Sequence, residues 1–147
     1  MPSAGQELTA AMLMPDAWVD WQAEGVSYTG ITVGNGTVKA AYAKVGAFVV
    51  CRWELTWGST TSFSGTPQVT LPYAAHGDYS QLHAIGPGSA NDASTAGSRA
   101  SFTAVHNSNA VFFLVDNLGS SATVSATIPW TWATSDYISF TGTYEAA

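Results

Sequence analysis

The stretch from Ala47 to Trp57 constrains the fold more than any other part of the chain. Its second half alternates strictly between polar residues and the apolar Cys51, Trp53, Leu55 and Trp57. Successive side chains of a β-strand point to opposite faces of a sheet, whereas a helix would scatter these four residues around its circumference. We therefore expect a strand with one apolar and one solvated face. Residues 48–50 are apolar on both faces, which predicts that the strand is covered on both sides where it begins.

Four large side chains on one face need a second layer to bury them, and the rest of the chain offers the segments for one. Further strand patterns cover residues 26–33, 37–45, 69–71, 98–105, 110–115, 121–128 and 137–144. Turn residues separate them about every 8 to 12 positions, which is typical of β-sandwiches and jelly rolls. We predict an all-β protein: an antiparallel, jelly-roll-like β-sandwich of about eight strands over residues 25–147.

The segments between the predicted strands contain patterns typical of turns and loops. Gly34-Asn35-Gly36 between two strand patterns predicts a β-hairpin with a type I′ turn. Residues 58–65, mostly Ser, Thr and Gly, predict a flexible loop. The short 69–71 segment is flanked by prolines, which favours an edge strand. Residues 73–91 have the least regular pattern and contain Gly86-Pro87-Gly88, which predicts a turn.

Residues 1–24 differ from the remainder and predict an N-terminal arm for docking or assembly. Residues 6–14 could form a short helix that ends before Pro15. Residues 16–24 carry tryptophans without strand alternation, so the arm would lie against its own sandwich or a neighbouring subunit. The candidate assembly residues are Leu8, Met12, Leu13, Trp18 and Trp21.

Charge narrows the function classes. Only 10% of the 147 residues are charged, where about 25% is usual, and the net charge is −6. This composition favours a protein whose surface is partly buried in an assembly. Nucleic acid and anionic lipid both need many positive contacts, so we expect binding to neither. No apolar run approaches the ~18 residues of a membrane span, and residues 1–7 lack a secretory signal, which predicts synthesis in a cytoplasm.

Motifs for catalysis are weak, and we do not expect an enzyme. His76, His83 and His106 lack the spacing of a metal site, and no serine-hydrolase elbow or nucleotide-binding loop is present, so no metal or cofactor is expected. Cys51 lies on the apolar side of its strand and is expected to be a buried free thiol. A glycosidase needs two carboxylates across a cleft, and the ten acidic residues leave this open. Glu54, however, faces away from Trp53 and Trp57, and Asp136 has no specific partner in the pattern.

Aromatic residues are the better candidates for binding. Trp53 and Trp57 share the apolar face of one strand and are expected in the core. Trp130 and Trp132 are two residues apart, hence on one face if extended, and could stack on a sugar, fill a subunit contact or pack in the core. Further candidates at loops or strand ends are Tyr73, Tyr79 and Tyr137.

Three segments resemble a known family. Residues 4–11 (AGQELTAA) are similar to the opening of many tail proteins of bacteriophages that infect actinobacteria. Residues 28–46, with YTGITVGNGT and then AYAKVG, resemble the opening of β-rich modules in phage minor tail proteins and fibres. Residues 125–145, with IPWTWA and DYISFTGTYE, resemble the close of the same modules. The matching motifs are structural.

The resemblance implies a virion surface protein, a homotrimer of sandwich domains that also contacts other virion proteins. It implies a site on the tail, where the module would contribute to host-surface recognition, with a host glycan as a further partner. The chain lacks a coiled coil, a collagen-like repeat and a shaft, which keeps a second interpretation open: a capsid decoration protein. A carbohydrate-active enzyme is the remote third.

Overall fold

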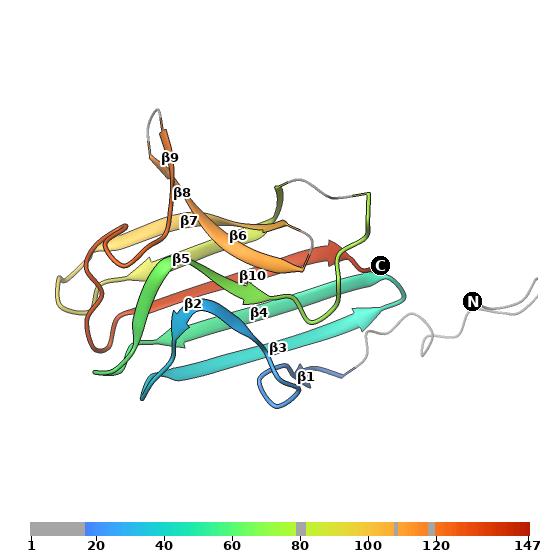
Figure 1. Cartoon of the computed structure of the whole chain (residues 1–147), viewed down its shortest axis with the longest axis horizontal. Helices are drawn as coiled ribbons and strands as arrows, with labels where there is room; N and C mark the ends of the chain where they lie inside the picture. The colour runs from blue at the N-terminus through green and yellow to red at the C-terminus, as the bar shows by residue number, and fades with distance from the viewer. Residues whose placement is uncertain (1–16, 79–81, 108, 118–119) are drawn as a thin grey trace, which may run out of the picture.

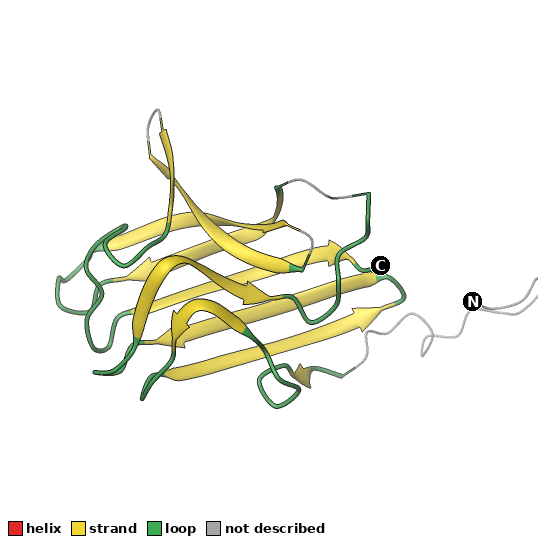
Figure 2. Cartoon of the chain, viewed as in Figure 1, coloured by secondary structure: helices red, strands yellow, loops and turns green. Residues whose placement is uncertain are grey.

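The computed structural model describes residues 17–78, 82–107, 109–117 and 120–147. Within these residues all regular structure is β and no helix occurs (Figure 2). The strands are β1 (Val19–Asp20), β2 (Tyr28–Thr32), β3 (Thr37–Val45), β4 (Phe48–Thr56), β5 (Ser62–Thr70), β6 (His83–Asn91), β7 (Arg99–Asn107), β8 (Ala110–Asn117), β9 (Ser120–Thr123) and β10 (Tyr137–Glu145). Every strand pairing among them is antiparallel. The predicted all-β antiparallel fold is confirmed.

The strands form one sheet that curls until its two halves face each other. Its order is β1-β3-β4-β10-β6-β7-β8-β5-β2, and β9 pairs with β8. In Figure 1, β2 and β5, which belong to the second half, lie in front of β4 and β10, which belong to the first half. Rings meet between these layers: the centroid of Trp53 on β4 is 6.3 Å from that of Tyr28 on β2 and 5.9 Å from that of Phe113 on β8. The result is sandwich-like, with the core between the two halves of the sheet.

Strand β4, which contains Cys51, Trp53 and Leu55, lies centrally in the first half of the sheet. β4 pairs along its whole length with β3 on one side and with β10 on the other. The predicted alternation is confirmed, because its inward residues Cys51, Trp53 and Leu55, and Trp57 just beyond its end, are all buried. The expectation of a start covered on both faces is wrong: Phe48 is 53% exposed, because β4 alternates from its first residue.

The Gly34-Asn35-Gly36 turn is not the predicted hairpin. β2 pairs with β5, and β3 pairs with β1 and β4, so the turn carries the chain from one half of the sheet to the other. Gly34 has a positive φ and Asn35 does not, which excludes a type I′ turn. The Asn35 side chain instead accepts hydrogen bonds from the Thr60 backbone N–H and hydroxyl, both at 2.9 Å. Tertiary contacts with residues 59–60 therefore replace strand pairing here.

Two predictions for residues 58–71 are wrong, one of a loop at 58–65 and one of an edge strand at 69–71. β5 takes in the second half of the predicted loop 58–65 and extends to Thr70. It is also not an edge strand, since β2 and β8 flank it. Pro67 lies between Phe63 and Gln68, the residues of β5 that pair with β2 on either side of a register shift, where a missing N–H is tolerated.

Gly86-Pro87-Gly88 is likewise part of a strand. β6 runs through it, with a register shift against β7 between Ala84 and Gly86. A Cβ at Gly88 would overlap the Phe102 ring, and one at Gly86 would overlap the Thr141 carbonyl oxygen on β10. The glycines are therefore required by close approach to neighbours and do not mark a turn.

Substitution of Gly86 tests this close approach. Gly86→Ala is expected to lower the free energy of unfolding by about 1–3 kcal/mol, because the obstructing atoms belong to the backbone of β10 and must move. Gly77→Ala is the control, since nothing lies within 4 Å of its added Cβ. Urea unfolding followed by circular dichroism measures both variants. Equal stability of the two would contradict the packing of β6 on β10.

Three of the remaining strand predictions are confirmed, and one strand is shorter than predicted. β7, β8 and β10 confirm the patterns at 98–105, 110–115 and 137–144, and β8 lies mid-sheet as expected. The strand predicted over 121–128 is too long, because β9 ends at Thr123 and Ser125 instead bridges to Ile128 across a turn.

The N-terminal arm is described only in its last part. The expected helix at 6–14, with Leu8, Met12 and Leu13, lies outside the described residues. β1 pairs with β3, and Trp21 is 3% exposed within the core. Glu24 accepts a 2.6 Å hydrogen bond from the Tyr42 hydroxyl, and this bond raises the pKa of Tyr42 well above its usual value. Residues 17–24 therefore pack against their own sandwich.

Candidate functional site

A groove of about 910 Å³ lies on the outer face of the first half of the sheet. Five neighbouring strands line it: β1, β3, β4, β10 and β6. Antiparallel pairing places the outward side chains of these strands in rows across the sheet. One row is Lys39, Glu54, Ser139 and Ser89, and the next contains Ala41, Arg52 and Thr141. Because alternate residues on the same strands fill the core, the groove floor is the wet face that the sequence pattern predicts.

Trp18 forms a wall of the groove beside β1. Its side chain is 51% exposed, and the guanidinium carbon of Arg52 lies 4.6 Å from the centroid of its ring. Such a cation–π contact contributes about 0.5–1 kcal/mol at an exposed site, enough to bias the orientation of the ring. Arg52 therefore covers part of the indole and orders it, and the exposed remainder of the ring is the aromatic surface that a ligand in the groove would contact.

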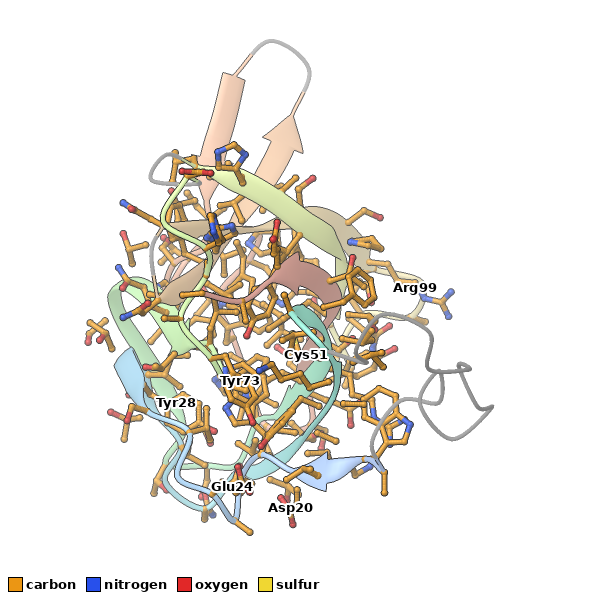
Figure 3. The ribbon with its side chains drawn as sticks, turned by 90° about the vertical axis from the view of Figure 1, so that its right-hand side faces the viewer. Asp20, Glu24, Tyr28, Cys51, Tyr73 and Arg99 are labelled. Atoms are coloured by element: carbon orange, nitrogen blue, oxygen red, sulfur yellow. The ribbon has the colours of Figure 1, made fainter. Side chains whose placement is uncertain are left out.

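The charges in the groove are balanced. Lys39 Nζ lies 3.5 Å from Glu54 Oε1, and both side chains reach solvent. Asp20, at the lower edge of Figure 3, accepts a hydrogen bond from the Ala23 backbone N–H at 3.1 Å. Gln22 accepts one from the Tyr28 hydroxyl at 3.3 Å. The wall at β1 and the floor together present both hydrogen-bond donors and acceptors.

Small side chains make up the far part of the floor. Ser139 on β10 pairs with Ser89 on β6, and both serines line the groove. Pro87 and Gly88 also line the groove. These residues leave the main chain of the sheet close to any ligand, and their hydroxyls can bond to one in either direction.

The structure places Trp130 and Trp132 against the core. Trp132 stacks on Trp57 with centroids 4.3 Å apart and planes at 11°, and its Nε1 donates to the Ser125 carbonyl at 2.8 Å. The ring centroid of Trp130 lies 5.6 Å from that of Trp132, and both rings are half-buried. Ring faces engaged in this way leave little flat surface for a sugar.

Neither Tyr73 nor Tyr137 lines the groove. Tyr73, labelled in Figure 3, is 38% exposed. Its ring meets that of Tyr42 edge-on with centroids 5.5 Å apart, and Lys44 Nζ lies 4.5 Å from its centroid. Tyr137 opens β10 and is 37% exposed. Tyr79 lies outside the described residues.

Two groups considered for catalysis, Asp136 and Cys51, are buried. Asp136 is fully buried, and its two carboxylate oxygens accept 2.8 Å hydrogen bonds from the backbone N–H groups of Ala93 and Ala133. Cys51 is buried as predicted, and burial raises the pKa of its thiol to about 12. A thiolate nucleophile is therefore disfavoured at neutral pH.

The histidines lie apart from the groove. His83 and His106 are paired neighbours on β6 and β7, with rings 5.9 Å apart, and His76 lies 3.5 Å from Asp78. Among the described residues, no three His, Cys, Asp or Glu side chains gather as metal ligands would.

Comparison of the chain with models of protein families, with curated proteins and with solved structures gives no match. No helix in the described part of the chain has the length and apolarity to cross a bilayer. The resemblance to phage tail modules stays a prediction, and the groove becomes the basis for any functional argument.

Sequence reasoning placed Trp18 in an assembly arm and did not find the groove. One signal for it was present: the outward positions of β4 are Arg52 and Glu54, which hold two of the chain's few charges side by side. The pairing that brings Lys39 and Ser139 next to them is not visible in the sequence.

Proposed function

We propose that this chain is a surface module of a bacteriophage virion, associated with the tail, that contributes to host-surface recognition by binding a glycan in the outer groove. The phage context rests on the sequence resemblance. The glycan rests on one observation: an exposed tryptophan oriented by Arg52 at the wall of a polar groove. Flat apolar area beside hydrogen-bonding groups matches the alternating C–H and hydroxyl surfaces of a sugar ring.

Removal of the Trp18 ring is expected to weaken glycan binding at least tenfold. Aromatic anchors of this kind typically contribute about 2 kcal/mol or more to an interface, and 1.4 kcal/mol corresponds to a factor of ten. Trp18→Ala and the parent chain are compared by titration calorimetry with the best ligand from a glycan array. Phe48→Ala is the matched control, since Phe48 is as exposed as Trp18 but is not among the groove residues. Equal loss in both variants would contradict a site in the groove.

The location on the particle needs a separate measurement. Immunogold electron microscopy of intact phage with antibody against this chain is expected to label the tail. Label over the head would instead support capsid decoration, and intact particles without label would contradict a virion role.

The same glycan distinguishes binding from turnover. Recovery of the ligand intact after prolonged incubation supports a binding module. Cleavage that Glu54→Gln abolishes would replace the proposal by the carbohydrate-active enzyme interpretation.

A further inference from the structure

We infer that the groove binds an uncharged oligosaccharide that lies across the strands, from Trp18 towards Ser89. This inference rests on the proposed function and names the class of glycan that the site would take. Two properties of the groove support it: the balance of charges among its lining residues and the direction in which it runs across the strands.

The charge balance disfavours acidic sugars. The groove contains two carboxylates, Asp20 and Glu54, and two cations, Lys39 and Arg52. Each cation already has a neighbour, Lys39 the Glu54 carboxylate and Arg52 the Trp18 ring. An acidic sugar would have to approach Asp20 and Glu54 on a chain whose net charge is −6. Sugar hydroxyls, which both donate and accept hydrogen bonds, fit the mixed lining without a charge of their own.

The direction of the groove indicates a chain of several sugar rings. It crosses five adjacent strands, and four strand spacings of about 4.8 Å give a length of about 19 Å. Trp18 closes one side at β1, whereas small residues line the far part on β10 and β6. A first ring can stack at Trp18 while later rings pass over Arg52, Glu54 and the serines. Each added ring then gains contacts with the next strand.

The test uses the full chain on an array of neutral oligosaccharides and of oligosaccharides that carry uronate, sialate or phosphate groups. Binding of neutral chains is expected, with loss in Trp18→Ala and retention in Phe48→Ala. Titration with the best neutral sugar as monosaccharide and as hexasaccharide is expected to show at least tenfold tighter binding of the longer form. Its Kd is expected to change less than about twofold between 50 and 500 mM NaCl, because no net charge is screened.

The outcomes separate the two proposals. Trp18-dependent binding confined to acidic glycans, weakened by salt, would overturn the uncharged ligand and leave glycan recognition in place. Equal affinity for monosaccharide and hexasaccharide would overturn the path across the strands. No Trp18-dependent binding to any glycan on the array would overturn the inference and the proposed recognition function together.

Discussion

Trp53→Ala is expected to lower the free energy of unfolding by about 3–5 kcal/mol. Trp53 is 1% exposed at the centre of β4, and its ring lies about 6 Å from those of Phe113 and Phe140. Since these rings come from β8 and β10, the indole joins the two halves of the curled sheet. Alanine would leave a cavity that a sheet paired on both sides of β4 cannot collapse to fill.

Urea unfolding followed by far-UV circular dichroism measures this loss without depending on tryptophan fluorescence. Arg52→Ala is the control, because Arg52 is the adjacent residue on the outer face of the same strand. The free energy of unfolding of Arg52→Ala is expected to lie within about 1 kcal/mol of that of the parent chain, because exposed charge contacts contribute little to stability. If Arg52→Ala were the more damaging variant, the two faces of β4 would be reversed.

Asp136→Ala is expected to lower the free energy of unfolding by about 2–4 kcal/mol, because two backbone N–H groups lose their carboxylate acceptor. Asp136 connects the loop between β6 and β7, through Ala93, with the loop before β10, through Ala133. Its own carbonyl oxygen accepts a 2.8 Å hydrogen bond from the Trp57 N–H. One buried residue therefore holds three segments at the same end of the sandwich.

Two further variants serve as comparisons for Asp136→Ala. Asp136→Asn retains one acceptor oxygen and is expected to lose less stability than Asp136→Ala. Asp92→Ala is the surface control, since Asp92 also accepts backbone hydrogen bonds, from Ser94 and Thr95, but in a solvent-facing loop where water can replace it. Equal melting temperatures of Asp92→Ala and Asp136→Ala would contradict a structural role for the buried carboxylate.

The strongly alternating segments were predictable because the side-chain period of a strand is a local property. Trp53 and Leu55 on β4, and Ile138 and Phe140 on β10, are buried as their alternation indicates. The weaker patterns failed where neighbours supply what the sequence lacks. Gly86-Pro87-Gly88 has little strand propensity, yet β7 and β10 hold it in the sheet.

Most of the candidate site could not be predicted from the sequence. Its wall and floor come from segments more than a hundred residues apart, from Trp18 to Thr141. Trp130 and Trp132 looked available because their spacing would put both rings on one face of a strand, but Trp132 stacks on Trp57 and Trp130 packs against the core. Tryptophans two residues apart have the same pattern whether they pack inward or meet a ligand.

By itself the sequence determined the fold class, the inward face of each strong strand and the burial of Cys51, since alternation and hydrophobicity act over a few residues. Tertiary structure decided that β2 and β3 lie in opposite halves of the sheet, although a Gly-Asn-Gly turn joins them. It also decided that Lys39, Glu54 and Ser139 share a row beside Trp18. Such partners depend on the register of whole strands, which the packing of the shared core selects.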